Sequence, residues 1–156
     1  AFQALFRNAL ATPYTLGVSA GASLGAAIYV HLGIVASVAG IPGHAFAALA
    51  GAVTSIALVY AVARATAGFS SSTLLLAGVA ISFLFTSMIL AIQYVGDVTT
   101  SFRIGRWLLG GLETVGFLPV LHVLPFAGAG IVMLLALSRD LDLLAVGEES
   151  AALRGV

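Results

Sequence analysis

The stretch TLGVSAGASLGAAIYVHLGIV, residues 15–35, carries no formal charge and has glycines at positions 17, 21 and 25. Because residues four apart lie on the same face of a helix, it predicts a helix with one face of small side chains. The uncharged run continues to Arg64, which is too long for a single membrane-spanning helix. It is interrupted by GIPGH, residues 40–44, where glycine and proline favour a turn. The sequence therefore predicts two apolar helices, over residues 15–35 and 45–64.

The rest of the chain continues this apolar pattern. Of the 156 residues, 61% are hydrophobic and 8% are charged, and the mean hydropathy is +1.16. A soluble domain has about a quarter charged residues, so a surface of this composition is expected to face lipid. Further uncharged runs predict helices over residues 73–95 and 118–138, and each predicted helix reaches the ~20 residues that cross a bilayer. The predicted fold class is all-α: a polytopic transmembrane helical bundle with about four full spans.

Composition and spacing argue against several classes of function. The net charge is zero, which leaves no basic patch for nucleic acid, and there is no cysteine for a disulfide or a thiolate metal site. The histidines, His31, His44 and His122, lack the spacing of a metal site. No nucleophile–base pair or phosphate-binding loop is apparent. We therefore expect a protein that is not an enzyme, with no catalytic residue, metal or cofactor of its own.

The arginines predict the orientation of the helices. Four spans would place four arginines on one side of the membrane: Arg7, Arg64, Arg139 and Arg154. The other side would hold Arg103 and Arg106. The positive-inside rule makes the first side cytoplasmic. No charged residue lies inside a predicted span, and intramembrane charges usually mark proton relays or ion sites. Their absence weakens the case for a proton-coupled pump.

Two segments are candidates for contacts. The small face of Gly17, Gly21 and Gly25 lets helix backbones approach closely in lipid, so it predicts helix packing, while a lining of a translocation path is the alternative. In the predicted outer loop, residues 96–117, Arg103 and Arg106 would share a face of a short helix. That helix is either a solvated interfacial element or a docking surface for an external partner.

The C-terminal stretch, residues 139–156, is more polar than the spans. Gly147 breaks the preceding run, and Glu148 and Glu149 then suit the first turn of a short helix that Gly155 would close. This helix is too polar to span a membrane. It predicts a contact with a partner on the cytoplasmic side.

Four segments together resemble the permease subunits of type II ABC importers for vitamin B12, ferric siderophores and haem. They occur in the family's order and cover the chain nearly end to end. They are QALFRNALATP with LGVSAGA (residues 3–13 and 16–22), SSSTLLLAG (70–78), GRWLLGGL (105–112), and LAVGEE followed by GV (144–149 and 155–156). The family fold has about ten helices, so the resemblance implies a partial chain, from the end of the second helix through the sixth.

The resemblance implies a permease that carries an iron-siderophore, haem or cobalamin-type substrate across the cytoplasmic (inner) membrane. ATP would be hydrolysed by a separate ABC ATPase subunit. The other implied partners are a periplasmic or lipid-anchored substrate-binding protein, a second permease copy that completes a homodimer, and membrane lipid, but no nucleic acid. The chain would form one partial permease domain, with a cytoplasmic turn (1–14), four spans with their loops (15–138) and a cytoplasmic coupling segment (139–156).

The resemblance also assigns residues. The ATPase-coupling residues that it implies are Gly147, Glu148, Glu149, Ala151 and Gly155. The cytoplasmic gate that it implies is formed by Asn8, Leu10, Ser71 and Ser72.

One alternative is a stand-alone secondary transporter, which should show intramembrane ionisable or unwound sites and inverted repeats. Another is a membrane-anchored interaction protein, which would not need the acidic segment after the fourth span.

Overall fold

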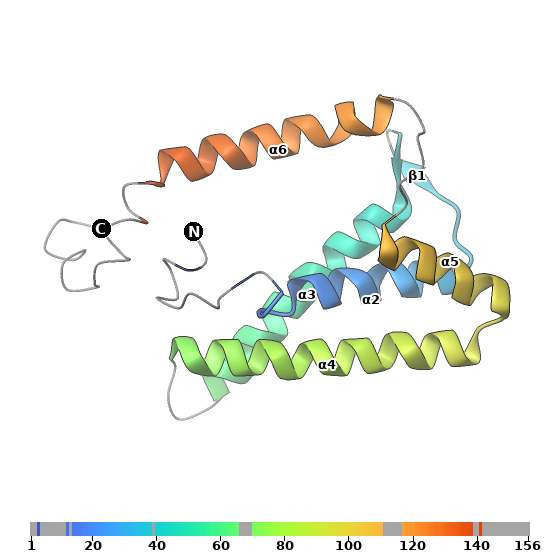
Figure 1. Cartoon of the computed structure of the whole chain (residues 1–156), viewed down its shortest axis with the longest axis horizontal. Coiled ribbons are helices and arrows are strands. Elements are labelled where there is room, and N and C mark those ends of the chain that lie inside the picture. The colour runs from blue at the N-terminus through green and yellow to red at the C-terminus, as the bar shows by residue number, and fades with distance from the viewer. Residues whose placement is uncertain are drawn as a thin grey trace, which may run out of the picture. The chain divides into compact units, whose positions relative to one another are not determined.

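The computed structural model describes residues 3, 12, 14–38, 40–65, 70–110, 117–138 and 141. Its elements are α2 (Val18–His31), β1 (Ser37–Val38), β2 (Ile41–Pro42), α3 (Gly43–Ala65), α4 (Ser71–Val95), α5 (Val98–Leu109) and α6 (Leu118–Ala136) (Figure 1). The chain divides into two compact units, Pro13–Leu112 and Ala1–Thr12 with Glu113–Val156. The described residues are mostly helical, as predicted.

Two helices are long and apolar enough to cross a membrane, among the residues that the structure describes: α3 and α4. Their 23 and 25 residues extend about 34 and 37 Å at 1.5 Å per residue, which exceeds the ~30 Å of a hydrocarbon core. They contain the predicted ranges 45–64 and 73–95. The first turn of α4 is fixed by Ser70, whose hydroxyl accepts a hydrogen bond from the Thr73 N–H at 3.2 Å.

The first predicted helix is shorter than expected. The range 15–35 is wrong, because α2 has 14 residues, a length of about 21 Å. Both ends are set by glycines in the left-handed region, Gly17 at φ +73° and Gly33 at φ +66°. The Gly33 N–H bonds the Val30 carbonyl at 3.1 Å, which closes the last turn. This helix alone does not reach the length of a full span, so the structure does not confirm four full spans.

In the second unit, α6 has 19 residues and matches the predicted helix 118–138 within two residues at its C-terminal end. It continues through Pro125, which lies inside the helix.

The predicted turn between the first two helices is a small β-hairpin. Ser37 on β1 pairs with Pro42 on β2, and Val38 pairs with Ile41 in antiparallel register. Gly40 turns the chain at φ +79°. Because the hairpin is tight, α3 begins at Gly43 rather than at residue 45.

Helix α2 packs closely against α3 through the predicted glycine face. A Cβ added at Gly21 would come within 2.5 Å of the Gly51 carbonyl oxygen, and one at Gly25 would overlap the Ala47 backbone. The two backbones are therefore in direct contact, antiparallel to each other. Lipid gives little hydrophobic drive between helices, so this close approach stabilises the pair by dispersion.

The N-terminus of α2 lies deep between α3 and α4. Ser55, near the middle of α3, is fully buried and donates a hydrogen bond from its hydroxyl to the Gly17 carbonyl at 2.8 Å. On the α4 side, a Cβ at Gly78 would overlap the Thr15 carbonyl oxygen. At the other end of α2, a Cβ at Gly96 would lie 3.5 Å from the His31 ring. Thus α2 runs beside the part of α4 from Gly78 to Gly96 and begins beside the middle of α3.

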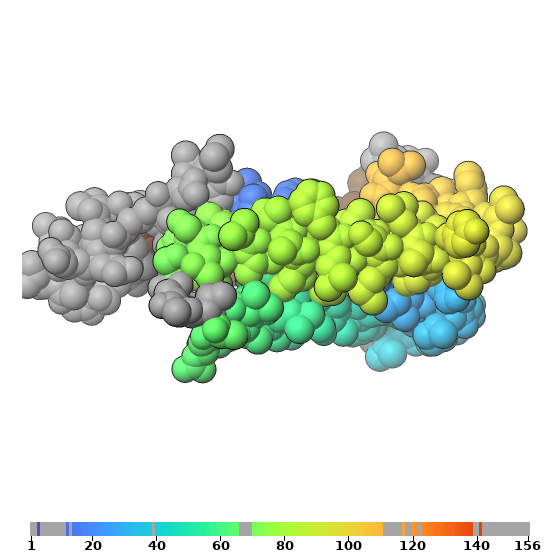
Figure 2. Space-filling view, turned by 90° about the horizontal axis from the view of Figure 1, so that it is seen from below, coloured from blue at the N-terminus to red at the C-terminus, as the bar shows by residue number. Residues whose placement is uncertain are grey.

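A single apolar cluster joins four helices of this unit. It consists of the buried side chains Leu24, Ala27, Val59, Ala77, Ile81, Phe85, Ile89 and Ile104. Away from this cluster, α3 and α4 expose large apolar side chains, such as Leu76 and Phe83, which are 73% and 71% exposed. Figure 2 shows α4 along one face of the molecule with α3 beside it. Such a surface is expected for helices in contact with lipid.

We predict that Gly51→Ala lowers stability in the full-length protein by about 1–3 kcal/mol, because the added methyl would overlap the Gly21 backbone. Gly105→Ala is the matched control, since it is also helical and its added Cβ would meet no atom within 4 Å. Thermal unfolding in detergent, followed by circular dichroism, measures both. Equal melting temperatures for the two variants would contradict the close α2–α3 contact.

We predict that Ser55→Ala costs about 1 kcal/mol, because it removes the hydrogen bond between α3 and the buried Gly17 carbonyl and leaves that carbonyl only the one from the Gly21 N–H at 2.9 Å. Thr54→Ala is the control in the same helix. The Thr54 hydroxyl is exposed and bonds Ala50 of its own helix at 2.8 Å, so its loss should change stability by less than about 0.5 kcal/mol. The same thermal measurement applies, and a Ser55→Ala loss no larger than the Thr54→Ala loss would rule out the proposed role.

Candidate functional site

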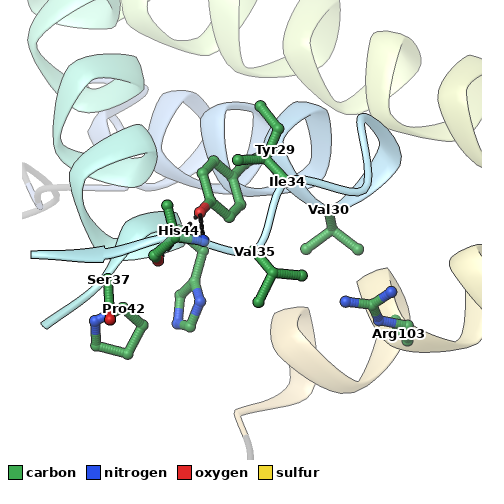
Figure 3. A pocket seen from close by; sticks show the side chains of 9 residues that line it. Tyr29, Val30, Ile34, Val35, Ser37, Pro42, His44 and Arg103 are labelled. Atoms are coloured by element: carbon green, nitrogen blue, oxygen red, sulfur yellow. Dashed lines mark hydrogen bonds between the residues drawn. The ribbon is translucent and has the colours of Figure 1, made fainter. Parts of the chain in front are cut away.

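A pocket of about 310 Å³ lies where the end of α2, the loop and hairpin that follow it, the start of α3 and the helix α5 meet (Figure 3). Val30, Ile34 and Val35 form its apolar wall, and the polar side chains of Tyr29, Ser37, His44 and Arg103 also line it. These residues come from four elements of one compact unit. The pocket is therefore a product of the tertiary fold.

Tyr29 holds the loop that forms one side of this pocket. Its hydroxyl accepts a hydrogen bond from the Ala36 N–H at 2.9 Å and donates one to the Ala36 carbonyl at 3.2 Å. The same carbonyl accepts the Gly43 N–H at 2.8 Å. A Cβ at Gly43 would overlap the Tyr29 hydroxyl, so glycine is required for this approach. The loop is thus fixed to both α2 and α3.

Helix α5 forms the opposite side of the pocket. Its N-terminal half is held by a helix cap and by a hydrogen bond to α4. The Asp97 carboxylate caps α5 by accepting the Thr100 N–H at 3.3 Å. Hydrogen bonding to the Thr100 side chain and to the N–H groups of this first turn holds the pKa of the Asp97 carboxyl below its ordinary value. The Ser101 hydroxyl donates to the Gln93 carbonyl at 2.8 Å. Ile104, 1% exposed, anchors the helix in the core.

The charge of the pocket is positive. Arg103 extends from α5 toward the loop that carries Val35 (Figure 3). His44 lies on the other side, and its ring meets the Trp107 ring edge-on, with centroids 6.3 Å apart. Among the residues described, no acidic side chain lines the pocket. The site can therefore accept an anionic group but has no carboxylate that could bind a cation.

The two arginines of the predicted outer loop, Arg103 and Arg106, both lie on α5. Both side chains are exposed, and Arg103 lines the pocket whereas Arg106 lies outside the pocket lining. Within the described part of the chain, no group of three His, Cys, Asp or Glu side chains could hold a metal ion.

The other predicted site residues are placed as follows. Gly17, Gly21 and Gly25 lie at the contacts of α2 with α3 and α4. Ser71 and Ser72 are exposed in the first turn of α4, directly after its cap, Ser70. Outside the described residues lie Asn8, Leu10, Gly147, Glu148, Glu149, Ala151 and Gly155.

Sequence reasoning missed three polar residues of the pocket: Tyr29, Ser37 and His44. None lies in a motif: Tyr29 fell within the predicted helix 15–35, His44 within the predicted turn, and Ser37 between the two. The loop and hairpin fold Ala36 back onto Tyr29, and α5 packs beside them. These tertiary contacts bring the three side chains into one pocket with Arg103. The GIPGH turn was the one local signal that pointed to this region.

Comparison with known proteins finds a transport family and permease proteins of ABC transporters. The FecCD transport family matches residues 1–156, the whole chain. The ABC transporter permease protein YvrB of Bacillus subtilis is 40% identical over 100% of this chain and 44% of its own length. The cobalamin import system permease protein BtuC of Halobacterium salinarum is 35% identical over 99% of this chain and 40% of its own length. The chain thus spans less than half the length of these curated relatives.

A solved structure has the same fold. A metal-chelate type ABC transporter in an inward-facing conformation matches 99% of this chain and 48% of its own chain, with a TM-score of 0.81 and 28% sequence identity. The resemblance noted from four sequence segments is confirmed by this fold and by the family match over every residue. The chain belongs to the FecCD transport family.

Proposed function

We propose that the full-length protein is the permease subunit of an ABC importer in the cytoplasmic (inner) membrane. Its cargo would be an iron-siderophore, haem or cobalamin-type substrate, and its energy would come from ATP hydrolysed by a separate subunit. The family match over residues 1–156 is the observation that carries this proposal. The exposed apolar faces of α3 and α4 support the membrane placement.

In this proposal the chain supplies four membrane segments, α2, α3, α4 and α6. Helix α2 is about 21 Å long and would occupy only part of the bilayer. At its N-terminus the buried Gly17 carbonyl accepts the Gly21 N–H at 2.9 Å and the Ser55 hydroxyl of α3 at 2.8 Å. Irregular backbone at membrane depth is tolerated where it is buried in protein, as it is at this junction. The inner halves of α3 and α4 then extend beyond α2 toward the cytoplasm.

The energy transfer would take place in the coupling segment, residues 139–156. Gly147, Glu148, Glu149, Ala151 and Gly155 would contact the ATPase subunit, and acidic residues early in a short helix suit its dipole. The gate would include Asn8, Leu10, Ser71 and Ser72. The exposed first turn of α4 supports the last two positions, since it leaves their hydroxyls accessible.

On the outer side, α5 would face the substrate-binding protein. Arg106 is exposed on this helix, and a rim charge of this kind steers and orients a docking partner more than it adds affinity. Arg103, the other predicted docking residue, is exposed on the same helix and lines the pocket. A second permease copy would complete the translocation path as a homodimer.

We predict that Glu149→Arg in the full-length protein uncouples ATP hydrolysis from uptake, because a reversed charge would repel a surface that accepts an acidic helix. Uptake of labelled cargo should fall about tenfold or more while membrane insertion is unchanged. Glu113→Arg, the same reversal in the predicted outer loop, is the control and should keep the wild-type ratio of uptake to hydrolysis. Wild-type coupling in Glu149→Arg would exclude this residue from the ATPase interface.

We also predict that a P-loop ATPase co-purifies with the full-length protein from its native membrane in mild detergent, in about equal amount. Mass spectrometry of the purified material tests this. If the protein is recovered without an ATPase even after cross-linking, the importer proposal fails and a stand-alone secondary transporter becomes the better account.

A further inference from the structure

We infer that the pocket between α2, the hairpin, α3 and α5 binds the phosphate of a phospholipid headgroup in the outer-facing leaflet. This inference rests on the proposed membrane placement and goes beyond import, since it concerns neither the cargo nor the ATPase. It names Arg103 as the principal phosphate-binding residue, with Ser37 and His44 across the pocket from it (Figure 3).

The chemistry of the pocket suits a phosphate. Guanidinium groups bind phosphate through two parallel N–H donors, which gives both charge and geometry. Arg103 brings such a group to the pocket, and His44 and Ser37 add polar side chains that can donate hydrogen bonds. Asp97 is the one acidic residue in the described part of the chain, and its carboxylate caps α5 instead of pairing with Arg103. No described carboxylate therefore competes with an anionic ligand.

The surroundings of the pocket favour a lipid over an acidic group on a soluble partner. The loop that forms its edge exposes Leu32, Val35 and Val38 by 62%, 92% and 62%. Aliphatic side chains of this exposure, next to a cation, are typical of segments that insert at the boundary between headgroups and acyl chains. Trp107, against His44, and Tyr94, 91% exposed at the end of α4, are the aromatic residues expected at that depth.

The pocket is also preorganised. The Tyr29 hydroxyl holds Ala36 by two hydrogen bonds, so the loop is already in place before a ligand binds. The buried Ile104 fixes α5, which fixes the backbone that carries Arg103. A ligand would then cost little ordering of the protein. This rigidity distinguishes the pocket from a general basic surface that attracts lipids diffusely.

The test uses the full-length protein in nanodiscs with equal amounts of phosphatidylglycerol and phosphatidylcholine. Native mass spectrometry measures the fraction that retains phosphatidylglycerol. Arg103→Gln should lower this fraction about fivefold, the effect of one cation at a membrane surface. Ser37→Asp, which adds a negative charge to the pocket, should lower it as well. Arg106→Gln, which removes the same charge from the same helix outside the pocket, should leave it within about twofold.

Several results would overturn the inference. Wild-type retention in Arg103→Gln and Ser37→Asp would exclude the pocket, and equal losses in Arg103→Gln and Arg106→Gln would indicate diffuse attraction to α5. Displacement of the lipid by millimolar inorganic phosphate would indicate a site for free anions. Weaker capture by the purified substrate-binding protein, with unchanged lipid retention, would assign Arg103 to protein docking. Specific retention without any co-purifying ATPase would support the lipid site while the importer proposal fails.

Discussion

The close backbone contact between α2 and α3 is the constraint on which the rest of this unit depends. In lipid, apolar side chains gain little by leaving the solvent for a neighbouring helix, so packing distance and internal hydrogen bonds must hold the helices together. Gly21 and Gly51 allow that distance because neither has a Cβ. Ser55 then adds a second hydrogen bond to the Gly17 carbonyl, beside the one from the Gly21 N–H, and so joins α3 to the start of α2. Any larger side chain along this face would separate the helices.

The two ends of α2 lie in different environments. Its N-terminus is buried between α3 and α4, at Ser55 and Gly78. Its C-terminus presents Tyr29 to the loop that returns to α3. The C-terminus of α2 lies near the start of α3. Because α2 is short, α3 and α4 continue past its N-terminus (Figure 1). The short α2, held between α3 and α4, thus sets where the loop and hairpin after it lie along these two helices.

The pocket at the end of α2 joins the membrane architecture to the proposed partners. Its walls are apolar, its side chains include an arginine and a histidine, and the Trp107 ring packs against His44. In the proposed importer, with an ATPase inside and a binding protein outside, the outer elements would have to lie at a defined depth. A headgroup bound between the hairpin and α5 would hold both elements there. The pocket would in that way position α5, whose Arg106 is proposed to face the binding protein.

The sequence alone determined the apolar helical class, the helices over 45–64 and 73–95, the small face of the first helix and the family, because these follow from local composition, spacing and ordered motifs. The tertiary structure decided the true length of α2, the hairpin in place of a simple turn and the place of Arg103 in the pocket lining. α2 ends at His31, and Gly33 closes its last turn at φ +66°, within an uncharged run whose composition continues past the helix end. The pocket joins Tyr29 to Arg103, which are far apart in sequence, and only packing can bring such residues together.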